Sequence, residues 1–253
     1  MDEVFVAKDS IVRKIWGKSD TVLFIFAGAA AEFALNKAVD WLYFTGRLPA
    51  DPLGRLFSTV AYARQIIFAK NEDALKSIDQ ITAIHKNVEK NRGANIPDWA
   101  YRDVLFLLID YSIRSFEALE RKLTDEEKVE TFDVFWRVGK RMNLKDLPAN
   151  FNAWVGVRDS HMANNLVRSE FTDDLYRQYK KHLGPIRYTL LLQVQFKLSP
   201  ARVNQLLSLK KSAWFTPVLR LYKFSRLFAM DQLLKSALLP AAYKAQIKRM
   251  DAV

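Results

Sequence analysis

Cysteine is absent from this chain of 253 residues, and glycine and proline occur only eight times each. Without cysteine the chain can form no disulfide, thiolate nucleophile, iron–sulfur cluster or cysteine-ligated zinc site. A chain of this length would hold roughly 18 glycines at the usual abundance of about 7%. The shortage of residues that form tight turns argues against a β-sandwich, a β-barrel or a dinucleotide-binding α/β domain.

The chain also lacks the short motifs of most familiar enzyme classes. It contains no phosphate-binding loop, no G-x-G-x-x-G segment, no G-x-S-x-G elbow and neither an H-E-x-x-H nor an E-x-x-H pair. Its most apolar stretch, residues 22–31, ends at Glu32, whereas a membrane span needs about 20 apolar residues. The first residues, Met1-Asp2-Glu3, are acidic where a signal peptide would be basic. We therefore expect a cytoplasmic protein without a membrane span.

Negative charge is scarce in only one part of the chain. Residues 1–175 hold 24 Lys and Arg against 26 Asp and Glu, a net charge of −2. Residues 176–249 hold 15 Lys and Arg and a single acid, Asp231, so they account for the overall charge of +11. Such asymmetry predicts contact with an anionic surface. Because no nucleic-acid recognition motif is present, we expect that surface to be a membrane rather than nucleic acid.

Signals for helix starts and stops recur along the chain, whereas strand signals do not. Asp51-Pro52 is an N-cap followed by proline at the first helical position, and Thr124 to Glu127 form a capping box. These signals predict an all-α fold with roughly nine or ten helices in a single domain, residues 1–253, whose basic C-terminal helices occupy residues 199–249. The clearest expected helices cover residues 19–44, 52–69, 71–92, 97–122, 125–142, 148–168 and 172–183.

His85 is the most informative of the three histidines. On the expected 71–92 helix it continues an apolar stripe at helical spacing, which places it on the buried face. A histidine in such a stripe is usually a core residue hydrogen-bonded to a neighbour. The alternative is a neutral, inward-facing imidazole that serves as an axial metal or haem ligand. The stripe consists of Leu75, Ile78, Thr82, His85 and Val88.

A second stripe, on the preceding helix, mixes polar and apolar side chains. An arginine and a threonine beside apolar residues could close on a buried ligand that carries negative charge or oxygen atoms. The alternative is that Arg55 is a solvated or ion-paired arginine at a helix start. His161, which shares a stripe with Trp154, is a weaker candidate ligand than His85. The second stripe consists of Arg55, Thr59, Tyr62 and Ile66, at helical offsets.

Several segments follow one another in an order and spacing that resemble a known family. Residues 51–59 contain an Arg-x-x-x-Thr motif, Arg55 to Thr59, and residues 71–88 contain the histidine helix. The 98–119 helix, the 126–141 helix and the turn at Asp146-Leu147-Pro148 come next. Together these segments resemble the MpaB-type oxygenase and latex-clearing rubber oxygenase family. The resemblance covers about residues 21–209, most of the chain.

This resemblance implies a mostly helical fold that holds a b-type haem. The histidine that ligates the haem iron in the family maps to His85. The Arg and Thr of the motif map to Arg55 and Thr59 at the haem pocket, where Arg55 would contact a propionate or bound oxygen and Thr59 would donate a hydrogen bond. Both would be catalytic as well as cofactor-binding residues, and Tyr62 on the same stripe would be a further cofactor contact.

Characterised members of the family cleave isoprenoid double bonds with O₂, in rubber or in a farnesyl side chain. An apolar pocket suits this chemistry because it excludes water and accepts a hydrocarbon. The resemblance therefore implies a haem-dependent oxygenase that acts with O₂ on an apolar, isoprenoid or lipid-like substrate.

The chain departs from the family's pattern at three places. Ser58 stands where rubber oxygenases carry a lysine, and Asn36 stands where many members have the histidine of an Ala-His-Pro segment. Residues 107–111 lack the histidine of a Trp-Val-His-Ala-Thr stretch. Rubber cleavage is thus not supported. Two alternatives follow: a non-catalytic helical protein at a membrane surface, and a haem-binding carrier or sensor.

Residues 214–223 mix large apolar side chains with cations, as helices at a membrane interface do. A helix of this kind could hold the protein peripherally on an anionic membrane. The alternative is that Lys and Arg cover the outside of ordinary packing helices, with their alkyl stems over apolar surface.

Overall fold

Helices make up nearly all of the regular structure in the computed structural model, which describes residues 4–46 and 50–226. Within these ranges the only strand-like pairing is two isolated bridges, Val4 with Lys70 and Asn36 with Leu166. The expected all-α class is confirmed. The described residues form 11 helices, more than expected because short helices such as α1 (Ile11–Trp16) and α3 (Asp40–Phe44) carry too few residues to show a 3.6-residue period.

The helices follow the chain in a simple order. They are α1 (Ile11–Trp16), α2 (Ser19–Phe33), α3 (Asp40–Phe44), α5 (Pro52–Phe68), α6 (Asn71–Arg92), α7 (Asp98–Leu119), α8 (Asp125–Arg141), α9 (Phe151–Asn164), α10 (Glu170–Leu198), α11 (Ala201–Leu206) and α12 (Phe215–Arg226). None of these helices, in the part of the chain that the structure describes, is long and apolar enough to span a bilayer.

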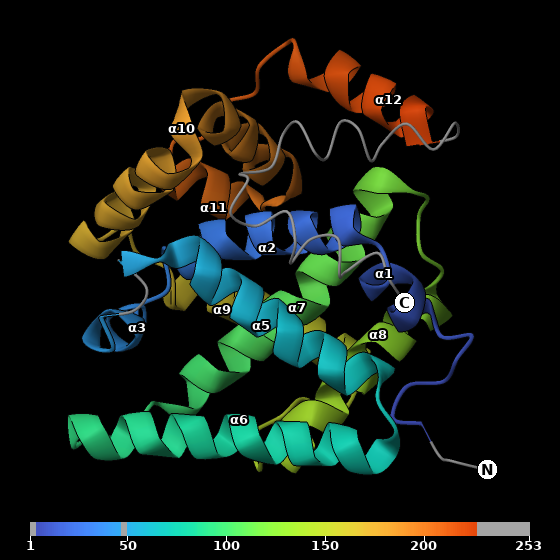
Figure 1. The fold of residues 1–253 in the computed structure, drawn as a ribbon, viewed down its shortest axis with the longest axis vertical. Helices are drawn as coiled ribbons and strands as arrows, with labels where there is room; N and C mark the ends of the chain where they lie inside the picture. The colour runs from blue at the N-terminus through green and yellow to red at the C-terminus, as the bar shows by residue number, and fades with distance from the viewer. Residues whose placement is uncertain (1–3, 47–49, 227–253) are drawn as a thin grey trace.

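Two helices with many buried residues, α2 and α7, form the centre of the molecule. They make the most extensive contact between any two helices, and α8, α10 and α1 pack against them. Figure 1 shows α6 along the lower edge of the molecule and α12 at the opposite, upper edge. The central pair is therefore enclosed on several sides.

Local signals fixed several helix ends as expected. The Asp51 side chain accepts a hydrogen bond from the Gly54 amide at 2.8 Å and caps α5. The capping box of α8 is complete, with Thr124 and Glu127 bonded reciprocally. α6 ends at Gly93, whose φ of 68° lies in the left-handed region that glycine adopts without strain.

The expected helix over residues 19–44 is wrong, because the chain leaves the helix after Phe33. The Asn36 side chain accepts a hydrogen bond from the Ala38 amide at 2.8 Å, and its backbone pairs with Leu166. Such a side-chain bond offers the backbone an alternative to the helical pattern. The chain turns here and resumes as α3 at Asp40.

α10 also differs from the expected 172–183 helix. It begins after Ser169, whose side chain forms a capping box with Thr172, and it runs on to Leu198. Gly184 does break the helix locally, with φ 72° and ψ 172°, but helical geometry restarts at Pro185. Proline is well suited to a first helical position, so the first helical stretch stops at Gly184 as expected and a second begins at Pro185, across a kink. Of the expected basic helices at 199–249, residues 227–249 lie outside the described residues.

Candidate functional site

A cavity of about 360 Å³ lies beside the central helix pair, with walls from α2, α5, α6, α7 and α8. Most of its lining is aliphatic or aromatic, and only a few polar groups face it. The polar side chains among the described lining residues are Asn36, Thr45, Arg55, Thr59, Tyr62, His85, Tyr101 and Tyr179. A cavity of this size with few polar groups is typical of a site for an apolar ligand.

The two stripes predicted from helical spacing meet at this cavity. Arg55, Thr59, Tyr62 and Ile66 from α5 all line it, as do His85 and Val88 from α6. His85 is the only histidine among its described lining residues. The structure thus brings together Arg55, Thr59, Tyr62 and His85, whereas the weaker candidate His161 does not line the cavity. Their catalytic and cofactor-binding roles remain predictions.

The Arg55 side chain is held by its own helix. Its Nη1 donates to Ser58 Oγ at 3.3 Å, and Ser58 Oγ in turn donates to the Arg55 carbonyl oxygen at 2.7 Å. Thr59 Oγ1 donates to the same carbonyl at 3.2 Å. Because that bond uses the only hydroxyl proton, Thr59 can accept a hydrogen bond from a ligand as it stands. Thr59 can donate a hydrogen bond to a ligand, as expected for it, only after its hydroxyl releases the Arg55 carbonyl.

His85 is an uncharged imidazole in the cavity wall. Burial, and secondarily the Arg55 guanidinium, lower its pKa from 6.5 to about 4, although Glu89 opposes the shift. Its buried Nδ1 has no hydrogen-bond partner among the described residues. The usual case, a core histidine whose nitrogens are hydrogen-bonded to neighbours, therefore does not hold for Nδ1. A neutral imidazole is the form that ligates metals.

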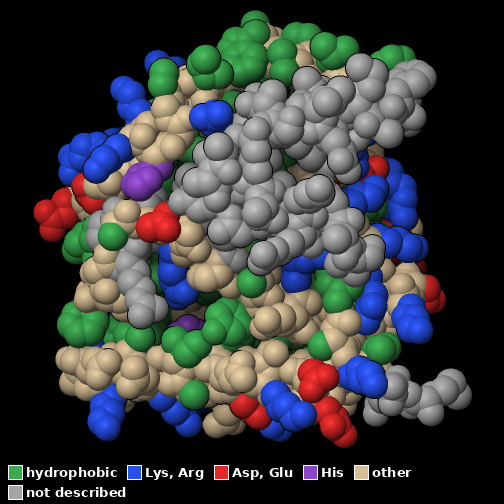
Figure 2. Space-filling model, in the orientation of Figure 1, with side chains coloured by type: hydrophobic (Ala, Val, Ile, Leu, Met, Phe, Trp, Pro, Cys, Tyr) green, Lys and Arg blue, Asp and Glu red, His purple; other side chains and the backbone are tan. Residues whose placement is uncertain are grey.

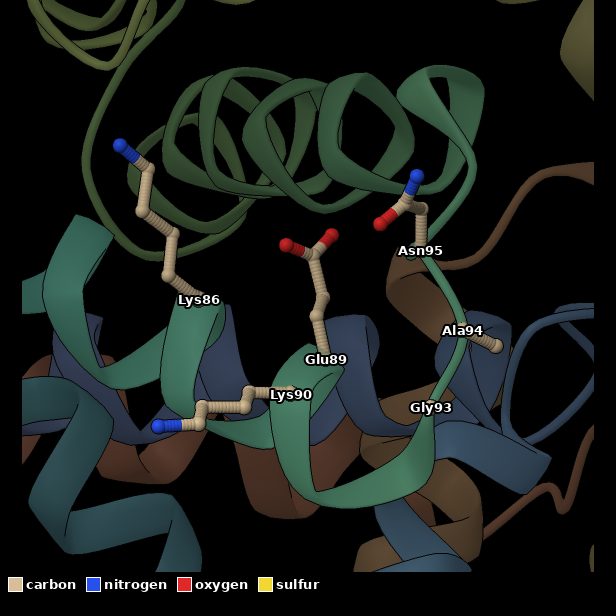
Figure 3. A pocket seen from close by; sticks show the side chains of 6 residues that line it. All are labelled: Lys86, Glu89, Lys90, Gly93, Ala94 and Asn95. Atoms are coloured by element: carbon tan, nitrogen blue, oxygen red, sulfur yellow. The ribbon is translucent and has the colours of Figure 1, made fainter.

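Two residues that the sequence did not single out position the His85 ring. The Tyr101 ring packs edge-on against it, with centroids 5.1 Å apart. Glu89 Oε1 accepts hydrogen bonds from Tyr101 Oη at 3.1 Å and from the Ile96 amide at 2.8 Å. Figure 3 shows Glu89 pointing from α6 towards α7. The spacing of four residues between His85 and Glu89 could have indicated Glu89, whereas no local signal marks Tyr101.

A buried charge cluster lies behind the cavity wall, where α2, α7 and α9 meet. We define it as Glu32, Asp103, Asp110, Arg114, Arg158 and His161. Arg158, only 5% exposed, is its centre. Its guanidinium pairs with Glu32, with one N–O distance of 2.6 Å, and with Asp110 Oδ2 at 2.8 Å. Tyr111 Oη also donates to Glu32 Oε2 at 3.1 Å. The guanidinium therefore satisfies two buried carboxylates at once.

His161 faces inward, as its stripe predicted, but into the charge cluster. Its Nε2 lies 2.9 Å from Glu32 Oε1. Its Nδ1 lies 2.8 Å from Asp103 Oδ2, in an ion-pair contact that is not aligned as a hydrogen bond. With a carboxylate at each nitrogen, His161 has no nitrogen left to ligate a metal, so its candidacy as a ligand is not supported. Asn36 Nδ2 donates to Asp103 Oδ2 at 3.3 Å and connects the cluster to the cavity lining.

The position of His161 predicts how stability depends on pH. Burial lowers its pKa, but Asp103 and Glu32 outweigh burial and raise it above the ordinary value of 6.5. Above pH 6.5 the folded chain then holds a proton that the unfolded chain has released, so the free energy of unfolding falls as pH rises through the raised pKa. Urea unfolding between about pH 6 and 9 checks this. We expect this decline in stability to be absent in His161→Gln and present in the control His182→Gln, which changes a histidine of α10. If stability fell equally with pH in the wild type and both variants, His161 would not be its cause.

The residues present fit a haem better than a metal ion held by several side chains. In the described ranges no three His, Asp or Glu side chains are arranged to hold a metal ion. A haem iron, in contrast, needs a single protein ligand on one face, because the macrocycle supplies four nitrogens. The unpaired Nδ1 of His85, its uncharged ring, the apolar walls and the nearby Arg55 cation meet the requirements of such a group.

Comparisons with known proteins gave one match. A family model described as "ER-bound oxygenase mpaB/B'/Rubber oxygenase, catalytic domain" matches residues 13–230. This range includes every residue of the cavity lining and of the charge cluster. No curated protein and no solved structure matched the chain.

Proposed function

The chain belongs to the mpaB/rubber oxygenase catalytic-domain family, and on that premise we propose that it is a haem-dependent oxygenase. Its substrate would be an apolar, isoprenoid or lipid-like molecule bound in the cavity, with O₂ as co-substrate. One observation carries the proposal: an uncharged histidine, with an unpaired buried nitrogen, lines a mostly apolar cavity that an arginine also lines.

Five polar residues of the cavity have a task in this proposal. His85 would ligate the iron, with its ring orientation held by Tyr101. Arg55 would bind a propionate carboxylate, since a guanidinium matches a carboxylate in charge and geometry. Thr59 and Tyr62 would contact the haem or the oxygen-bearing ligand from the same helix face. When bound, the haem would supply the redox-active iron at which O₂ reacts.

The apolar walls would perform two further functions. They would bind the hydrocarbon substrate by removing its surface from water, and they would keep water away from the reacting atoms. Cleavage of a C=C bond by O₂ into two carbonyl groups balances in atoms and electrons without a further reductant. The proposed reaction therefore needs no redox partner protein.

The visible spectrum of the purified full chain, produced with haem supplied, tests the proposal. We expect a Soret band in the wild-type protein and its loss in His85→Ala. The fall in haem affinity should exceed the roughly 10–100-fold effect of losing an outer-shell partner of a ligand. His182→Ala is the matched control, because His182 lies outside the cavity, and it should retain the wild-type spectrum.

Each outcome has a definite meaning. A wild-type protein that remains colourless and takes up no added hemin would overturn the proposal, as would an unchanged spectrum in His85→Ala. A protein that binds haem through His85 but consumes no O₂ with any isoprenoid or lipid substrate would instead be a carrier or sensor.

A further inference from the structure

α12 uses one face to attach to the rest of the molecule. Phe215 is buried, and Leu219 packs against the main core. Tyr222 Oη donates to Asp20 Oδ2 at 3.0 Å, and Arg226 pairs with both Asp20 and Glu120. These four side chains recur at helical spacing and define one stripe. The orientation of α12 is therefore fixed, and so is the direction of its other face.

The other face is apolar and exposed. Val218, Leu221 and Phe224 are 46, 66 and 58% exposed, and Trp214, just before the helix, is 43% exposed. Figure 2 shows hydrophobic side chains gathered along the upper edge of the molecule, over α12 and the bend of α10. Ile186, which follows that bend, is 79% exposed. Single exposed apolar residues are ordinary, but a contiguous group indicates an interaction surface.

The segment of the chain that carries this face has charged side chains of one sign only. Residues 176–226 hold 11 Lys and Arg and no Asp or Glu. Lys210, Lys211 and Arg220 are exposed and form no ion pair with another described residue. Arg220 lies one position from Leu221 and four from Phe224, so it borders the apolar face. A partner that fits must offer hydrocarbon and distributed negative charge together.

We propose that α12 is a membrane-docking helix for anionic bilayers. Trp214, Val218, Leu221 and Phe224 would enter the boundary between headgroups and acyl chains, and the neighbouring cations would contact the headgroups. A second copy of the chain fits less well, since a symmetric contact would set these cations against each other. This inference stands on α12 alone and holds whether or not the cavity binds haem.

Flotation of the full chain with vesicles tests the proposal. We expect binding to vesicles that contain phosphatidylserine, weaker binding to pure phosphatidylcholine vesicles, and a decline as salt increases. The double variant Val218→Ser/Leu221→Ser should lower the partition coefficient at least roughly 10-fold, because it removes two of the four apolar side chains of this face. Lys211→Glu/Arg220→Glu should lower it on anionic vesicles by more than about 10-fold.

Matched controls use exposed residues elsewhere on the molecule. Val129→Ser/Val155→Ser changes two valines that are 41 and 42% exposed on α8 and α9, and Lys76→Glu/Lys145→Glu reverses two exposed charges. Both should bind like wild type. Wild-type binding that ignores phosphatidylserine, or equal losses in the controls, would overturn the proposal. So would a wild-type dimer that Val218→Ser/Leu221→Ser converts to a monomer without any vesicle binding, since α12 would then be a dimer interface.

Discussion

Replacement of Arg158 by methionine is expected to lower the free energy of unfolding by about 3–5 kcal/mol, the usual effect of removing one partner from a buried ion pair. The variant removes the cation that Glu32 and Asp110 share. Both carboxylates then stay buried without it, since their side chains are only 1 and 11% exposed. A chain of this kind has a total stability of about 5–15 kcal/mol. The loss is therefore a large fraction of the whole.

Urea unfolding followed by far-UV circular dichroism measures this effect. Arg168→Met is the matched control, because Arg168 pairs with Asp173 at the surface, where both side chains are about half exposed. An exposed pair contributes about 0–1 kcal/mol, so the control should differ little from wild type. If Arg158→Met stayed within 1 kcal/mol of wild type, the cluster would have to be hydrated, contrary to its burial.

Gly28→Ala is expected to destabilise the protein by about 2 kcal/mol, although alanine is intrinsically the better helix former. Gly28 lies in α2 directly against Tyr111 of α7, and an added Cβ would lie 2.3 Å from Tyr111 Cδ1. The tyrosine ring is fully buried, and its hydroxyl is bonded to Glu32. To make room, the ring must move and weaken that bond. The glycine is thus required by the close approach of the two central helices.

Gly156→Ala provides the opposite case. Gly156 is exposed on α9, and nothing lies within 4 Å of an added Cβ. Here only the helix propensity changes, so the substitution should stabilise the protein by about 0.5–1 kcal/mol. Denaturant midpoints of the two variants should move in opposite directions. If Gly28→Ala raised the free energy of unfolding, α2 and α7 would be able to move apart without destabilising the protein.

The sequence predicted the parts of the structure that depend on near neighbours. Asp51 and Thr124 marked helix starts because capping is local. The stripes through Arg55 and His85 predicted inward faces, and those faces proved to line one cavity. The end of α2 was missed because one of its causes, the pairing of Asn36 with Leu166, joins residues 130 positions apart in sequence.

The buried charge cluster was missed for the same reason. Arg158 and Glu32 are separated by 126 residues, and nothing near either residue predicts their contact. A signal was nevertheless present: Glu32 interrupts the most apolar stretch of the chain, and Asp110 lies in an apolar helix. Carboxylates on such helices are rarely buried unless they are paired. In the sequence, Glu32 was interpreted only as the end of an apolar stretch, so its ion pair with Arg158 was not predicted.

The charge cluster also constrains how this protein can evolve. Glu32, Asp103 and Asp110 face Arg158 and His161, with the partly exposed Arg114 beside Asp110, so neutralising Glu32 or Arg158 alone leaves a buried charge short of a partner. Exchange of the whole set for apolar residues of similar volume avoids that penalty. Among descendants of this sequence, these six positions should therefore be inherited together or replaced together, and intermediates that keep half of the set should be rare.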